Sequence, residues 1–264
     1  MKKYIILFSF LFFGNSLFGQ FREVVRSIRP GNTMGVWTVG KKVFQIQQFY
    51  RFTHEEYTST RILGGTSGNL FRYGITERFE LQTIANFRFD RTNVLDGTVE
   101  PNTVSGISGL MLGARYHLGR PFGENLFLSA IQVRVNLPHS SDYSEIDYLR
   151  TTTTLALGQK ILPKFLLNLA IGYQTNANEN VDNRLNIGIR GNFGLSEKMS
   201  LILEHFGTFN NNIYVDGFDA GIDYIISDNV KLDVMAGWRN FPIVRSNFGV
   251  VGITYRFHKR DNPN

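Results

Sequence analysis

The sequence predicts an all-β fold: a transmembrane antiparallel up-and-down β-barrel of about twelve strands. Apolar and polar residues alternate with a period of two along most of the chain after residue 43, and this period places successive side chains on opposite faces of a strand. The links between the predicted strands are alternately short and long. The strands are near ten residues long, which is the length that a tilted strand needs to cross a bilayer. Together these features are typical of bacterial outer-membrane barrels.

Residues 1–19 predict a secretory signal peptide that is cut after Gly19. Lys2 and Lys3 form a positively charged start, and the apolar run Tyr4–Phe13 follows them, as in secretory signals. The run is too short to cross a bilayer as a helix. No cysteine stands at the cleavage point, so a lipid-anchored lipoprotein is excluded.

The mature chain is predicted to form one domain with two flanking segments. Residues 20–42 lack periodicity, and we expect an irregular lead-in. Its Arg22, Arg26 and Arg29 could lie in or near a barrel mouth, although a flexible solvated segment is favoured. The barrel is predicted at 43–257, and residues 258–264 form a C-terminal tail.

Twelve stretches of alternating residues are predicted as strands, and no stretch of helical period competes with them. Short links, such as Glu77-Arg78 and Ser227–Asn229, alternate with longer polar links, such as Asp90–Gly106 and Pro138–Leu149. In an antiparallel barrel the short links then lie at one end and the long links at the other. The predicted bounds are about 43–53, 69–76, 79–89, 107–118, 126–137, 150–160, 164–175, 183–193, 199–209, 216–226, 230–238 and 247–257.

The hairpin 216–238 shows the alternation most clearly. Its turn is Ser227–Asn229, and pairing about that turn sets Asp223 beside Asp233. Like charges directly opposite each other destabilise a strand pair. We therefore expect Lys231, or an arginine from another strand, to lie between the two carboxylates.

The faces of the strands distinguish a membrane barrel from a soluble β-sandwich. The apolar faces contain almost no charge, and aromatic residues recur near strand ends, among them Phe89, Tyr173, Trp238 and Tyr255. Aromatic girdles at both interfaces are typical of membrane barrels. We expect the apolar faces to contact lipid and the polar faces to point inward. A soluble β protein with its apolar faces buried is the alternative.

Composition and spacing exclude several classes of function. The chain has no cysteine, which removes thiol nucleophiles and thiolate metal sites. The net charge of +6 falls to +4 when Lys2 and Lys3 leave with the signal peptide. This mild basicity is spread along the chain, so no nucleic-acid partner is expected. The five histidines have no zinc-site spacing, and we expect neither a metal nor a cofactor.

Charged residues on the predicted polar faces form the candidate site. A charged lumen can select solutes. In a narrow barrel, paired charges can instead fill the interior and close it. Both interpretations stay open, because strand number alone does not fix the width of the lumen. The candidate lumen-lining residues are Glu80, Arg88, Arg115, Arg134, Arg190, Glu204, Asp219, Asp223, Lys231, Asp233 and Arg256.

Three loop motifs have simpler interpretations than a site. His139-Ser140-Ser141-Asp142 contains a Ser and a His, but a working pair needs a third group that orients the base, and these residues fall in a predicted external loop. We predict no catalytic residue and no enzyme activity. Asn176–Asn183 is rich in oxygen ligands that could hold Ca²⁺, although a solvated loop is favoured. Gly64–Gly68 lacks the Lys-Ser/Thr ending of a phosphate loop and is predicted as a flexible tip.

Two resemblances support the barrel. The strand Val251–Phe257 ends in an aromatic residue and resembles the C-terminal signal that outer-membrane barrels present to the barrel assembly machinery, although here residues 258–264 follow it. Leu81–Asp90, Gly113–Tyr116, Val135–Pro138 and Asp219–Tyr224 resemble the family named for the MetA pathway of phenol degradation. That resemblance implies an outer-membrane barrel that passes small hydrophobic or aromatic compounds. The glycine that often follows the proline in that family is replaced here by His139-Ser140-Ser141.

The expected function is passage of small solutes, with hydrophobic or aromatic compounds as candidates, by diffusion along the lumen or through a side exit. The long loops Asp90–Gly106 and Pro138–Leu149 are expected to gate entry. The alternative is a structural or adhesive barrel with a plugged lumen and binding loops. We expect the protein in the outer membrane of a Gram-negative cell. Its expected partners are outer-membrane lipids, a small hydrophobic solute, and the barrel assembly machinery through the strand that ends at Phe257.

Overall fold

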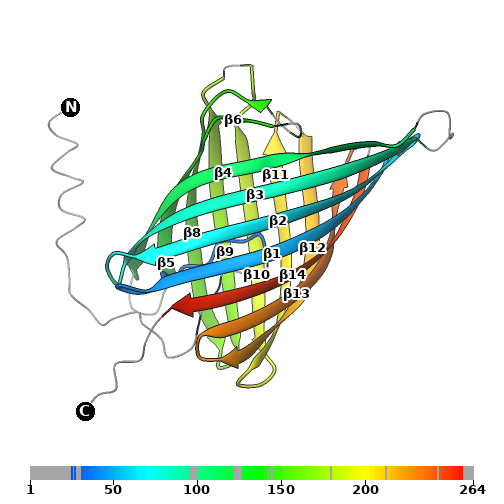
Figure 1. Ribbon diagram of the computed structural model, residues 1–264. Coiled ribbons are helices and arrows are strands. Elements are labelled where there is room, and N and C mark those ends of the chain that lie inside the picture. The colour runs from blue at the N-terminus through cyan, green and yellow to red at the C-terminus, as the bar shows by residue number, and fades with distance from the viewer. Residues whose placement is uncertain are drawn as a thin grey trace, which may run out of the picture.

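Twelve strands close into one antiparallel barrel, which confirms the predicted fold class (Figure 1). The computed structural model describes Val25, Ser27 and residues 31–94, 100–121, 127–141, 143, 145–178, 180–211, 213–242 and 244–257. The predicted signal peptide, the C-terminal tail, and Arg22, Arg26 and Arg29 of the lead-in lie outside these residues. The barrel strands are β1 (Phe44–Glu56), β2 (Thr60–Gly74), β3 (Phe79–Val94), β4 (Asn102–Gly119), β5 (Leu128–Asn136), β8 (Arg150–Leu162), β9 (Phe165–Asn176), β10 (Arg184–Gly194), β11 (Met199–Asn210), β12 (Ile213–Ser227), β13 (Val230–Phe241) and β14 (Val244–Phe257).

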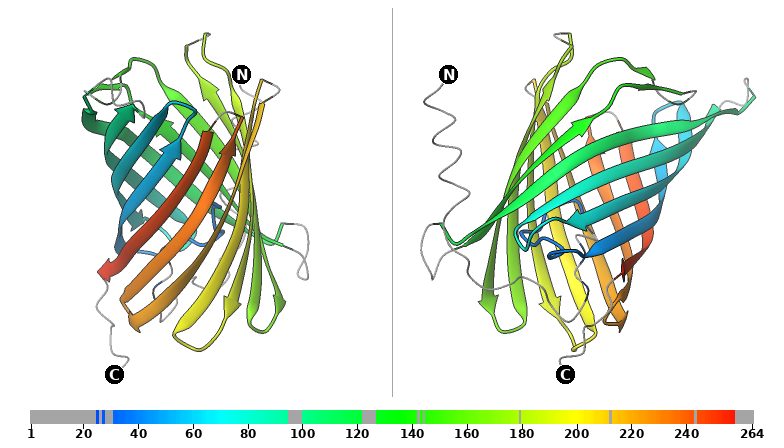
Figure 2. Two further views of the ribbon diagram at one scale, coloured as in Figure 1. Left: turned by 90° about the vertical axis from the view of Figure 1, so that its right-hand side faces the viewer. Right: turned by 60° about the vertical axis from the view of Figure 1, so that its left-hand side comes forward.

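Neighbouring strands of the chain are neighbours in the barrel, and β14 closes the wall by pairing with β1 (Figure 2). Two short strands, β6 (His139–Ser140) and β7 (Glu145–Ile146), form a separate hairpin between β5 and β8. In the view of Figure 1, β1–β4 cross the near side of the barrel at a shallow angle, and β8–β11 run steeply behind them. The use of β14 by the assembly machinery stays a prediction.

Several strands are longer than predicted at the end away from the chain termini. β2 begins at Thr60 rather than near 69, and β13 runs to Phe241 rather than to 238. Gly64–Gly68, predicted as a flexible tip, lies inside β2 and pairs with β1 and β3 on both sides, so that prediction was wrong. These extensions lack a clean apolar face, and hydrogen bonds to both neighbours define them instead. Three of the six links predicted as long, those after β1, β11 and β13, are therefore short.

The register of the hairpin 216–238 is as predicted. Asp223 pairs with Asp233 across β12 and β13. Lys231 Nζ lies 2.8 Å from Asp223 Oδ2, and this ion pair offsets the repulsion between the two carboxylates.

The barrel has the reverse polarity of a soluble protein. Large apolar side chains, such as Ile171, Val234 and Val251, are about half exposed on the outer face. The interior instead buries Gln45 and Gln47 with many charged residues. Soluble proteins bury apolar side chains and leave charge outside, so this arrangement excludes the soluble alternative. The described residues contain no helix that is long and apolar enough to span a membrane.

Candidate functional site

Residues 31–43 lie inside the lumen, where the sequence predicted a solvated lead-in. Thr33, Met34, Val36, Thr38 and Val39 are all buried, so the prediction was wrong for the part of the lead-in that the structure describes. We call residues 31–43 the lumen segment. Backbone at Gly40 has φ of +96°, a region that glycine adopts without strain, and the segment turns there toward β1.

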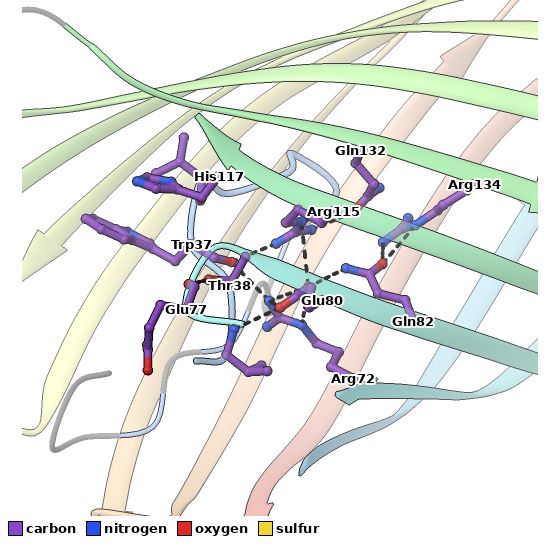
Figure 3. Close-up of polar contacts among 12 residues, drawn as sticks. Trp37, Thr38, Arg72, Glu77, Glu80, Gln82, Arg115, His117, Gln132 and Arg134 are labelled. Atoms are coloured by element: carbon purple, nitrogen blue, oxygen red, sulfur yellow. Dashed lines mark hydrogen bonds and ion pairs between the residues drawn. The ribbon is translucent and has the colours of Figure 1, made fainter. Parts of the chain in front are cut away.

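The first anchor of the lumen segment is a buried cluster on β2, β3 and β4 (Figure 3). Glu80 lies between Arg72 and Arg115, and all three side chains are at most 2% exposed. Arg72 Nη2 donates to Glu80 Oε2 at 2.8 Å, and Arg115 Nε lies 3.8 Å from Glu80 Oε1. An isolated charge is costly to bury, so the carboxylate and the two guanidinium groups stabilise one another.

The same three side chains hold the backbone of the lumen segment. Arg72 and Arg115 both donate to the carbonyl oxygen of Trp37, at 3.0 and 2.9 Å. Glu80 Oε2 accepts a hydrogen bond from Val39 N at 2.8 Å. His117 extends the cluster on β4: its Nδ1 is 3.0 Å from Val36 O, and its ring stacks on Trp37. Charged groups on three adjacent strands therefore satisfy polar backbone atoms that the lumen would otherwise leave unpaired.

The second anchor lies on the opposite wall. Glu204 Oε1 on β11 accepts hydrogen bonds from Asn32 N at 2.6 Å and Thr33 N at 2.9 Å. Asn32 Nδ2 donates to Asp219 Oδ2 on β12 at 2.9 Å. In the barrel order β11 and β12 stand across from β3 and β4. The lumen segment is therefore fixed by polar groups at two opposed points of the wall.

Between the two anchors, the segment packs on small side chains. Met34 and Val36 form an apolar cluster with Ala130, Ala156 and Ala170 of β5, β8 and β9. A Cβ added at Gly158 would lie 3.1 Å from Val36 Cγ2, which is closer than most real contacts. Alanine and glycine on this wall leave the volume that the segment occupies.

Two cavities adjoin the lumen segment along this wall. One has a volume of about 270 Å³ and is lined by Asn32, Thr33 and Met34 together with residues of β5, β8–β11 and β13. The other has a volume of about 800 Å³ and is lined by Gly35, Trp37 and residues of β8–β12. Gly172 borders the first, and Gly158 borders the second. The lumen is thus narrowed by the segment, with open space on both of its sides.

The sequence of this barrel matches one known family. Residues 27–257 match the family described as "Putative MetA-pathway of phenol degradation". The chain belongs to this family. The match confirms the resemblance found in the motifs, and the closed barrel with an apolar exterior places this member of the MetA-pathway family in the outer membrane, as predicted.

Solved structures share the fold at low sequence identity. The COG4313 outer membrane channel from Pseudomonas putida F1 is 11% identical, with a TM-score of 0.64 over 88% of this chain and 100% of that chain. The NanC porin is 7% identical, with a TM-score of 0.57 over 79% and 98%. The translocator domain of the autotransporter NalP from Neisseria meningitidis is 11% identical, with a TM-score of 0.53 over 81% and 88%. No curated protein sequence matches this chain.

In this member of the MetA-pathway family, the eleven predicted site residues are divided among separate clusters. Glu80 and Arg115 belong to the first anchor, and Glu204 and Asp219 to the second. Arg134 donates to Gln82 Oε1. Arg190 on β10 lies opposite Glu204 in the strand register and donates to Asn192 Oδ1, so it adjoins the second anchor. The others lie elsewhere: Asp223 with Lys231 beside Asp233, Arg88 with Asp90 and Glu55, and Arg256 with Asn229.

Sequence reasoning missed Arg72 of the first anchor and Arg239, which lines the first cavity. Arg72 lies within a predicted strand, but its inner-face neighbours include Leu70 and Gly74, so the face did not stand out as polar. Arg239 falls one residue beyond the predicted end of its strand. Arg239 lies an even number of residues from Lys231 and Asp233, which point inward. Positions two apart share one face of a strand, so this spacing could have identified it.

The loop motifs form no recognisable site among the described residues. His139 Nδ1 is 3.0 Å from Leu137 O, and Ser141 Oγ donates to Ile107 O at 3.0 Å. Between β6 and β7, burial raises the pKa of the Tyr143 phenol. Asn176 Nδ2 donates to the carbonyl of Asp182. The described part of the chain has no group of three His, Cys, Asp or Glu side chains that could hold a metal.

A disulfide between the lumen segment and β10 is expected to form in the Thr33→Cys, Gly188→Cys double variant. A Cβ added at Gly188 would lie 3.2 Å from Thr33 Cβ, close to the separation found in disulfides. The chain has no other cysteine, so mass spectrometry after trypsin digestion would identify the cross-link without ambiguity. The control pair Thr33→Cys, Ile189→Cys places the second thiol on the outer face, and it should stay reduced. Failure of the first pair to oxidise would contradict the position of the segment.

Proposed function

We propose that the protein is a diffusion channel that passes small solutes across the outer membrane, along the β8–β10 side of the lumen segment. The observation that supports this path is the position of the two cavities, one on each side of the segment and both against the same strands. The segment meets this wall through packing on alanine and glycine. Apolar packing is non-directional, so a small displacement there costs less than breaking either polar anchor.

The family description supports aromatic compounds as one class of solute, since it refers to phenol degradation. Four of the charged residues that were predicted to select solutes have a structural role in this proposal. Glu80, Arg115, Glu204 and Asp219 hold the lumen segment in place, and they set the width of the path before any solute reaches it. No step in this mechanism forms or breaks a covalent bond.

The rival function is a structural or adhesive barrel whose lumen stays closed. The observation that favours it is the polar character of both anchors, which are buried and lie on opposite walls. A closed barrel would be silent in a planar bilayer, whereas a diffusion channel would give discrete conductance steps.

Narrowing the first cavity is expected to reduce conductance. Gly172 lines that cavity, and a phenylalanine there would fill space that the proposed path uses. The matched control is Ile171→Phe, one residue away on the outer face, where the side chain is 54% exposed. We expect the Gly172→Phe variant to lose most of the single-channel conductance and the Ile171→Phe variant to retain it. Equal conductance in both variants would place the path elsewhere.

A further inference from the structure

The first cavity has an unusual charge for a space inside this barrel. Its lining includes two arginines, Arg134 on β5 and Arg239 on β13, and no aspartate or glutamate. β5 and β13 stand on opposite sides of the wall, so the two guanidinium groups approach the cavity from opposed directions. The lumen segment forms its floor through Asn32, Thr33 and Met34.

Among the described residues, neither arginine has a carboxylate within hydrogen-bonding or ion-pair distance, although Asp219 and Glu55 lie near enough to Arg239 for their charges to act on it. Arg134 donates to the neutral Gln82 Oε1, at 3.1 Å from Nη2 and 3.3 Å from Nε. The Nε of Arg239 is buried and has no hydrogen-bond acceptor. The nearby carboxylates of Glu204 and Asp219 accept hydrogen bonds from the lumen segment instead. Burying a guanidinium group without a directly bonded anion is costly, and an anion in the cavity would offset that cost.

The remainder of the lining is partly apolar. Phe206 and Ala170 border the cavity beside Met34. Arg239 Cζ lies 5.2 Å from the centre of the Phe206 ring, so the guanidinium group is held against an aromatic face. Thr154 and Thr208 add hydroxyl groups. A ligand that satisfies this lining has one anionic end, an apolar body, and a size that fits about 270 Å³.

We propose that this cavity is a binding site for a small organic carboxylate with an apolar body. The carboxylate accepts hydrogen bonds from Arg134 and Arg239, which match it geometrically and electrostatically. The apolar body lies against Phe206, Ala170 and Met34. The binding site itself does not depend on the proposed channel. Its consequence does rest on that function: if the channel conducts, such anions pass in preference to neutral molecules of the same shape.

Binding can be measured without any flux, by isothermal titration calorimetry on the purified full-length protein in detergent. Benzoate is the probe, and benzyl alcohol is the neutral molecule of similar shape. We expect saturable binding of benzoate and at least about tenfold weaker binding of benzyl alcohol, which cannot form the charge-assisted hydrogen bonds. Equal binding of the two compounds, or no binding of benzoate, would overturn the proposal.

Variants then locate the site. Arg239→Gln and Arg134→Gln should each weaken benzoate binding about tenfold or more, whereas Arg245→Gln, which removes an exposed arginine of β14, should leave it unchanged. If a glutamine variant fails to fold, Arg239→Lys keeps the charge but loses the two-pronged geometry, and it should bind more weakly than the wild type. Benzoate binding that is insensitive to both positions would overturn the assignment.

The channel and the site can fail separately. If the protein is silent in planar bilayers but binds benzoate through Arg239, the binding site is supported and the channel is contradicted. If the protein conducts but shows no arginine-dependent benzoate binding, the channel is supported and the binding site is contradicted.

Discussion

Replacing Glu80 with glutamine is expected to destabilise the barrel and release the lumen segment. Glu80 is fully buried and lies between Arg72 and Arg115. Removing its charge leaves two buried guanidinium groups without an anion, at a cost of about 3–5 kcal/mol. The variant also weakens the acceptor for Val39 N. We expect a lower urea midpoint and a more mobile segment.

Trp37 allows both effects to be observed. The chain has two tryptophans, and Trp238 lies on the outer face, so a Trp238→Phe background leaves Trp37 as the only indole. In that background Glu80→Gln should increase quenching of Trp37 fluorescence by iodide. The matched control is Glu56→Gln, whose side chain is 50% exposed and pairs with an exposed Arg61. Unchanged quenching and an unchanged urea midpoint in Glu80→Gln would show that the anchor contributes little.

Deleting residues 31–39 is expected to raise the single-channel conductance severalfold. None of these residues belongs to a strand pair, so the wall should still assemble. The deletion removes both anchors together with the apolar side chains that pack on β5, β8 and β9. Planar-bilayer recording of the deleted and wild-type proteins checks the result.

A second variant separates the loss of volume from the loss of the anchors. Replacing residues 31–39 with glycine and serine keeps the chain length but gives a flexible segment, so its conductance should be intermediate and noisy. If the deleted protein conducts no better than the wild type, other residues fill the lumen and the proposed role of the segment is wrong.

The wall of this barrel was largely predictable, because it depends on local alternation. The hairpin of β12 and β13 is the clearest case: its period of two and its polar turn fix which residues face each other, and Asp223 pairs with Asp233 as expected. Strand ends were less predictable. β2 gains Thr60–Gly68 through hydrogen bonds to β1 and β3, and a glycine-rich sequence with no apolar face gives no sign of those bonds.

The contents of the lumen were not predictable by the same method. Residues 31–43 have no period, and they are held by partners far away in the chain, such as Glu80 and Glu204. The sequence identified Glu80, Arg115, Glu204 and Asp219 as inward charges. It could not show that all four would form hydrogen bonds with a single segment, because that pairing depends on the three-dimensional closure of the wall.

The position of the lumen segment ahead of β1 in the chain has a consequence for the order of folding. The contact between Val39 and Glu80 spans 41 residues, whereas that between Thr33 and Glu204 spans 171. Closing the longer loop costs about 1 kcal/mol more in chain entropy. The segment can therefore bind to β3 while the sheet is still open. The later strands, β11 among them, then close the barrel around a segment that is already in place.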